Sequence, residues 1–121
     1  MGKFDHLAIQ VRDVDASRDW YVKTLGLAVE FELAESGVVA LKDDADFALF
    51  LNRVDGAPRT IGLGLWYKVA DVTAFHRAAV SGGAVFDHGP KKALWGYSAQ
   101  LSDPDGHRLY VWDEDSMAAN G

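Results

Sequence analysis

Apolar and polar residues alternate at the start of the chain, over residues 4–11 (FDHLAIQV). Side chains in a strand point to opposite faces with a period of two. Leu7, Ile9 and Val11 are therefore expected on one face and His6 on the other. The segment is predicted to be a strand that has an apolar face toward a helix layer and a second, more open face.

A helix of about three turns is predicted directly after this strand. In the segment DVDASRDWYVKTLG, Asp13 or Asp15 can cap the start of the helix and Gly26 can end it. Further alternating segments, separated by glycine-containing or acidic turns, predict three strands at 27–34, 38–42 and 46–52.

The same order of elements recurs after a linker at 55–60. The hexapeptide VRDVDA at 11–16 matches VADVTA at 69–74, where a strand again passes into a helix that an aspartate can cap. We therefore predict one α+β domain over residues 1–121, made of two βαβββ modules at about 1–54 and about 60–115. The second module is expected to contain a helix at 71–83 and strands at 61–69, 84–89, 96–102 and 107–113.

Paired modules of this kind are expected to form a curved mixed sheet with helices on its outer face and a concave cup on the other. Small residues at Ala8, Gly62 and Gly64 would leave gaps in the cup. An aromatic and apolar concavity is typical of a small-molecule site. The same side chains could equally form a core or a dimer interface. The expected lining is Phe4, His6, Phe47, Leu49, Leu51, Trp66, Tyr110 and Trp112.

Composition narrows the function classes. The chain has 49% apolar and 25% charged residues and no cysteine, so it is expected to fold as a globular domain without disulfides or thiolate metal sites. A net charge of −6 disfavours nucleic acid as a partner, and it either serves solubility or attracts a cationic ligand. No segment approaches the ~20 apolar residues of a membrane span, so we expect a cytoplasmic protein with no membrane partner.

Three segments, distributed over nearly the whole length of the chain, carry a family resemblance. FDHLAIQVRDVDASRDWYVKTLGL, VADVTAFHRAAVSGG and WGYSAQLSDPDGHRLYVWDE resemble the vicinal-oxygen-chelate superfamily, which includes glyoxalases, bleomycin resistance proteins and extradiol dioxygenases. The resemblance implies paired βαβββ modules, a cup-shaped site and a homodimer. Trp95 and Gly96, before the penultimate strand, resemble the metal-free, antibiotic-binding branch, in which an aromatic ring can stack on a flat ligand.

Metalloenzymes of this superfamily hold a divalent metal at four pseudo-symmetric strand positions. Carried over to this chain, the positions fall on His6, Gly64, Tyr110 and, in the glyoxalases that use it, Leu49. Only His6 is a good ligand, whereas a catalytic metal needs about three protein ligands. The positions of His76, His88 and His107 do not suggest that these residues supply the missing metal ligands. The resemblance therefore predicts no cofactor, with a divalent metal as the alternative.

Two functional hypotheses follow. The first is a metal-independent binding protein that sequesters a planar or cationic aromatic compound through Phe4, His6, Phe47, Leu49, Trp66, Trp95, Tyr110 and Trp112. The second is an enzyme, either a lyase or a dioxygenase with a non-standard metal site, or a cofactor-free enzyme that uses His6 as a general base. His6 could also be structural and contact Tyr110. A structural dimer without a ligand is the third possibility.

Overall fold

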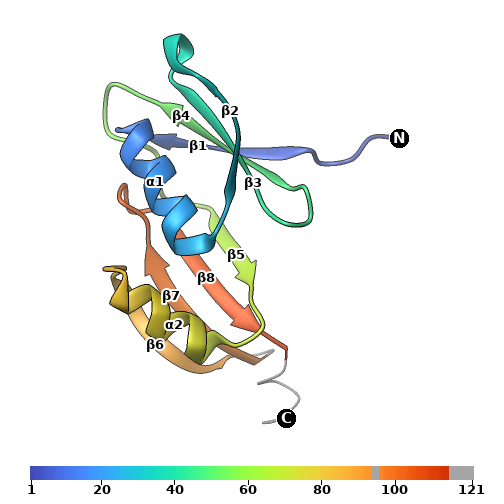
Figure 1. The fold of residues 1–121 in the computed structure, drawn as a ribbon, viewed down its shortest axis with the longest axis vertical. Coiled ribbons are helices and arrows are strands. Elements are labelled where there is room, and N and C mark those ends of the chain that lie inside the picture. Colours follow the sequence, from blue (N-terminus) through green and yellow to red (C-terminus); the bar gives the residue numbers. More distant parts are fainter. Residues whose placement is uncertain (94–95, 115–121) are drawn as a thin grey trace. The chain divides into compact units, whose positions relative to one another are not determined.

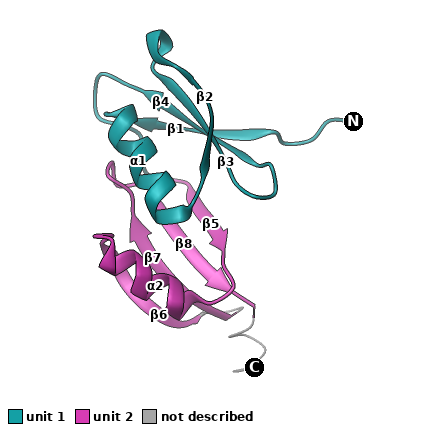
Figure 2. Cartoon of the chain, in the orientation of Figure 1, with its two compact units in different colours: residues 1–61 teal, residues 62–121 magenta. Residues whose placement is uncertain are grey.

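The computed structural model describes residues 1–93 and 96–114, and Figure 1 shows its elements. The chain divides into two compact units, which Figure 2 colours separately: Met1–Ile61 (unit 1) and Gly62–Gly121 (unit 2). Each unit has a four-stranded sheet and one α-helix, in the order strand, helix, three strands. The predicted α+β class and the repeated βαβββ order are confirmed.

Unit 1 has the strand order β1-β4-β3-β2, in which β1 and β4 are parallel and the other pairs are antiparallel. A short 3-10 turn, η1, separates β2 from β3. The elements are β1 (His6–Val11), α1 (Val14–Leu25), β2 (Ala28–Leu33), η1 (Ala34–Ser36), β3 (Val38–Lys42) and β4 (Ala48–Arg53).

Unit 2 repeats this topology with the order β5-β8-β7-β6, and here β5 and β8 form the parallel pair. The elements are β5 (Gly64–Lys68), α2 (Val72–Ser81), β6 (Phe86–Ala93), β7 (Gly96–Ser102) and β8 (Arg108–Asp113). Neither helix of the described chain is long and apolar enough to cross a membrane.

Both helices begin at the predicted aspartates. The Asp13 carboxylate accepts a hydrogen bond from the Ala16 amide at 3.0 Å, and the Asp71 carboxylate does the same for Ala74 at 3.0 Å. Each carboxylate satisfies an amide that the helix itself leaves without a partner. Gly26 ends α1 in the left-handed conformation, with φ of 72°, which glycine adopts without a steric cost.

Each helix packs on one face of its own sheet. In unit 1, Ile9, Val11 and Leu41 lie buried on that face with Tyr21 of α1. In unit 2, Leu101, Leu109 and Val111 lie buried on the corresponding face, and Val72 of α2 is buried as well. The alternation predicted for β1 is therefore confirmed, and the opposite face of each sheet carries no helix of its own unit.

The expected placement of Leu49 and Leu51 on the helix-free face is wrong. The parallel register pairs Leu7 with Leu49 and Ile9 with Leu51, so both leucines share the helix-covered face and are buried. Phe50, between them, lies on the helix-free face. The residues at 47–51 are a continuous apolar run, and such a run contains no alternation from which the facing of the strand could be read.

The start of the second module also differs from the prediction. The strand begins at Gly64 rather than at residue 61, so Ile61, Gly62 and Leu63 precede it. Ile61 is exposed, and Gly62 has a φ of 90°. A residue in the left-handed region interrupts an extended strand, which explains the later start of β5.

A buried carboxylate joins α2 to the last strand of its sheet. Asp113, at the end of β8, is 1% exposed, and its Oδ2 accepts a hydrogen bond from the Val72 amide at 2.7 Å. Val72 is the first residue of α2, so this bond fixes the start of the helix against the sheet. A second aspartate shapes the turn before β8, where Asp103 accepts from the amides of Asp105 and His107 at 3.0 and 2.8 Å.

We predict that Asp113→Ala lowers the free energy of unfolding by about 2 kcal/mol, because a buried amide loses a charged acceptor. Urea denaturation followed by circular dichroism measures the effect. Asp71→Ala, which removes the exposed cap of the same helix, is the matched control and should cost about 1 kcal/mol. An Asp113→Ala cost no larger than that of Asp71→Ala would contradict the buried anchoring role.

Candidate ligand-binding site

The helix-free face of unit 2 carries three of the aromatic side chains proposed from the sequence: Trp66, Tyr110 and Trp112. The register aligns Trp66 with Tyr110 and Lys68 with Trp112 across the parallel β5–β8 pair. In the antiparallel direction Gln100 lies opposite Tyr110. Paired residues in a sheet share a face. We call this surface the unit 2 face: Gly64, Trp66, Lys68, Ser98, Gln100, Ser102, Arg108, Tyr110 and Trp112.

Trp66 of the edge strand β5 and Tyr110 of the neighbouring β8 form a parallel ring stack on the unit 2 face. Their ring centroids are 4.5 Å apart and their planes differ by 13°. Trp66 is 48% exposed, so the stack is not enclosed within unit 2. Flat π systems favour such stacking, and the outer face of the pair can extend the stack onto a planar ligand.

Gly64 provides the space that the Tyr110 ring needs. A Cβ atom built at Gly64 would lie 3.0 Å from Cε2 of Tyr110, closer than a van der Waals contact. The tyrosine ring therefore lies over the glycine backbone while it stacks on Trp66. This close approach explains a glycine within a strand, where it otherwise costs stability.

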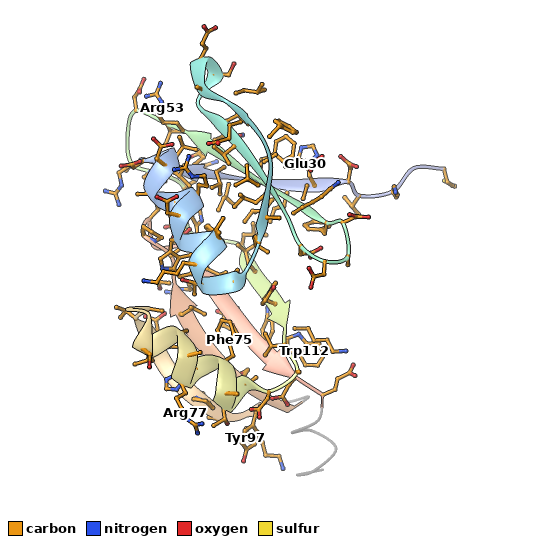
Figure 3. The ribbon with its side chains drawn as sticks, viewed as in Figure 1. Glu30, Arg53, Phe75, Arg77, Tyr97 and Trp112 are labelled. Atoms are coloured by element: carbon orange, nitrogen blue, oxygen red, sulfur yellow. The ribbon has the colours of Figure 1, made fainter. Side chains whose placement is uncertain are left out.

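Trp112 is already engaged by a cation from its own unit. Lys68 Nζ lies 5.6 Å from the centroid of the Trp112 ring and 3.0 Å from a carboxylate oxygen of Glu114. Figure 3 shows Trp112 projecting from β8. A lysine over the ring competes with any ligand cation for that π surface. Trp66 and Tyr110 are therefore better placed to stack with a ligand than Trp112.

The helix-free face of unit 1 carries a different aromatic cluster. The His6 ring stacks on Phe50 at a centroid distance of 4.1 Å, and Phe31 meets Phe50 edge-on at 5.6 Å. His6 Nδ1 also lies 3.1 Å from Asp5 Oδ2. Phe31 and Phe50 are not among the site residues predicted from the sequence. Pairing Phe31 with Ala40 and Ala40 with Phe50 would have revealed them, but that register cannot be read from one sequence.

The other proposed residues are placed as follows. Phe4 precedes β1 and is fully exposed, and Phe47 lies before β4 and is also exposed. Leu49 is on the helix-covered face, as described above. Trp95 lies outside the described residues. His6 belongs to unit 1 and Tyr110 to unit 2, and the contact between them stays a prediction.

The described residues do not fit a divalent metal at the positions that the sequence comparison indicated. Gly64 has no ligand atom, and Tyr110 is held in the ring stack. Because His6 pairs with Ala48 as Gly64 pairs with Arg108, the unit 1 counterpart of Tyr110 is Phe50 rather than Leu49. Phe50 has no donor either. Within 1–93 and 96–114, no three His, Asp or Glu side chains cluster as a metal site would require.

Comparison with known protein families identifies the superfamily. A family model described as Glyoxalase/Bleomycin resistance protein/Dioxygenase superfamily matches residues 3–111. The chain belongs to this superfamily. The resemblance carried by its three sequence segments is thereby confirmed. No curated protein sequence matches the chain.

Solved structures of the same superfamily share the fold. TnmS3, an antibiotic binding protein from Streptomyces sp. CB03234, aligns with a TM-score of 0.80 and 24% identity over 93% of this chain and 96% of that chain. A superfamily member from Sphaerobacter thermophilus DSM 20745 gives 0.79 and 22%, with 94% and 98% covered. A possible glyoxalase from Bacillus cereus gives 0.77 and 19%, with 93% and 99% covered. At these identities the likeness concerns the fold.

We predict that Gly64→Ala displaces the Tyr110 ring and changes the near-ultraviolet circular dichroism of the protein. Alanine favours a strand over glycine by about 0.5–1 kcal/mol, and the ring stack is worth about 0.5–1.5 kcal/mol. The free energy of unfolding should therefore change by less than about 1 kcal/mol while the aromatic spectrum changes. Gly56→Ala, which has open space at its Cβ, is the control. Identical spectra for both variants would disprove the close contact.

Proposed function

We propose that this member of the superfamily is a metal-independent protein that binds a small planar molecule. The observation that carries the proposal is the exposed stack of Trp66 on Tyr110 at 4.5 Å. Two parallel rings that already stack in the free protein form a preorganised platform, so a flat ligand meets less of an ordering cost when it adds a third layer.

The metal-ligand positions support binding without a metal. At the place where a ligand-donating residue would stand, this chain has Gly64, and Tyr110 uses the vacated space to stack on Trp66. The glycine at this position and the placement of the ring are linked, because a Cβ atom at position 64 would lie 3.0 Å from Cε2 of Tyr110 and the ring would have to shift. The same two positions thus serve stacking instead of coordination.

The structural relatives agree with this proposal in a general way. TnmS3 is described as an antibiotic binding protein, and its fold matches nearly all of this chain. Capture of a flat, antibiotic-like compound is therefore the most direct form of the proposed function. We further propose that the protein acts as a cytoplasmic homodimer, which is supported by the exposed apolar side chains of β2, Val29, Phe31 and Leu33.

His6 supports a second candidate, an enzyme of the lyase or dioxygenase type. Its Nδ1 is paired with Asp5 Oδ2 at 3.1 Å, which orients the ring and leaves Nε2 as the nitrogen that could accept a proton. An imidazole held by a carboxylate is a suitable general base. Both side chains are exposed, however, and solvent screens the interaction between them, so Asp5 contributes little to the activation of His6 as a base.

Metal analysis separates the two candidates. We expect protein purified without an affinity tag to contain no stoichiometric metal and calorimetric titrations with Zn²⁺, Ni²⁺, Mn²⁺ and Fe²⁺ to show no saturable site, since fewer than three ligands are present at the predicted positions. The control is His6→Ala, which should behave like the unmodified protein in each titration. Saturable, His6-dependent metal binding would instead favour the enzyme and direct the search for further ligands to a partner subunit.

Planar probes test the binding proposal directly. We expect acridine to bind and to quench tryptophan fluorescence, and Trp66→Ala to weaken its affinity by about fivefold because one stacking surface is lost. Trp20→Leu is the control, since Trp20 lies on α1 and contacts Tyr21 instead of the sheet face. Equal affinities for Trp66→Ala and the unmodified protein would contradict a ligand stacked on the Trp66–Tyr110 pair.

A further inference from the structure

An irregularity in β6 brings a carboxylate to the unit 2 face. The register of β6 against β7 shifts between Phe86, which pairs with Leu101, and His88, which pairs with Gln100. The shift leaves Asp87 as an unpaired residue, in the manner of a β-bulge. Bulges re-aim side chains and are frequent beside binding sites. Here the Asp87 side chain reaches across to Gln100 and Ser102, which belong to the unit 2 face.

Two neutral donors orient the Asp87 carboxylate. Its Oδ2 accepts from the Ser102 hydroxyl at 3.0 Å and from the Gln100 side-chain amide at 3.3 Å. Both donors use the same oxygen, so Oδ1 has no hydrogen-bond partner, and Asp87 has no ion-pair partner among the described residues. The bulge therefore presents an oriented negative charge without an ion pair on the unit 2 face, two strands from Tyr110.

The basic groups of the same sheet do not neutralise this charge. Arg108 lies opposite Ser102 on β8, two strands from Asp87, which corresponds to about 10 Å between backbones. His88 is adjacent in sequence, and its Nδ1 lies 2.9 Å from the Gly89 carbonyl oxygen. Lys91 pairs with Ser98, at the other end of the β6–β7 pair. None of the three comes within ion-pair distance of Asp87.

We propose that Asp87 is the residue of this site that recognises a cationic group, so that the ligand class is a flat aromatic molecule with a positively charged nitrogen. The inference rests on the proposed function and deepens it. The aromatic part would stack on Trp66 and Tyr110, and the nitrogen would lie toward Oδ1 of Asp87. Gln100, which faces Tyr110 and bonds Asp87, lies between these two subsites. Cations favour such a combination of π faces and a carboxylate.

The test compares two probes of the same shape, acridine and N-methylacridinium, in mildly alkaline buffer where acridine is neutral. Their affinities are measured by fluorescence titration, and the readout is the preference for the cation. We expect the unmodified protein to prefer N-methylacridinium and Asp87→Asn to reduce that preference by about threefold to fivefold, as for an exposed charge pair. Arg108→Gln, which removes a competing positive charge, should increase the preference.

Three controls make the result specific. Asp44→Asn removes the same charge from the turn before β4 and should leave the preference as it is. Ser102→Ala removes one of the two donors that orient the carboxylate and should reduce the preference by less than Asp87→Asn does. Added salt should weaken the preference in the unmodified protein, because exposed charges are screened.

The outcomes separate this inference from the proposed function. If both probes bind in a Trp66-dependent way but Asp87→Asn keeps the full cation preference, the role of Asp87 is disproved and the planar site remains. If Asp44→Asn lowers the preference as much as Asp87→Asn, the effect is one of net charge and the role of Asp87 is again disproved. If neither probe binds, the proposed function fails, and the inference fails with it.

Discussion

The parallel pairing of the first and last strands of each unit determines which side chains can work together. In β1–β4 and β5–β8, residues that are paired in the register share a face, and the helix of the same unit covers only one of the two faces. A shift of one residue would exchange the two faces completely. The Trp66–Tyr110 ring stack and the close approach of Tyr110 to Gly64 both depend on this register, because each of them combines residues from β5 and β8 on one face.

The two units share this register, but the ring that stacks on the last strand comes from a different position of the first strand in each unit. In unit 1, Ala8 lies directly beside Phe50, and the ring that stacks on Phe50 comes from His6, two residues earlier. In unit 2 the directly paired residue, Trp66, supplies the ring, and the position equivalent to His6 is Gly64. One backbone pattern thus supports a histidine–phenylalanine surface in one unit and a tryptophan–tyrosine surface in the other. The two surfaces differ in polarity, although their strand geometry is the same.

The sequence predicted the fold well and the site only in part. Aspartate caps, turn glycines and period-two alternation are local signals, so both helices, the eight strands and the repeated order could be read directly. The sequence could not show which side chains of β4 point to which face of the sheet, because its apolar run does not alternate. Leu49 was therefore predicted at the site position that Phe50 occupies. Asp87 was missed for a related reason. Its position on the site face comes from a local register shift in β6, and pairing between strands is not visible in a single sequence.

The contact between Gly64 and Tyr110 restricts the order in which this chain could change. A histidine introduced at position 64 would crowd the Tyr110 ring, since even a Cβ atom there lies 3.0 Å from Cε2 of the ring. The histidine could bind a metal only after the ring had moved. A carboxylate introduced first at position 110 would remove the ring partner of Trp66 without a second ligand beside it. Each single replacement disturbs the ring stack without completing a set of metal ligands. Positions 64 and 110 therefore constrain each other, because a change at either position disturbs the stack of Tyr110 on Trp66.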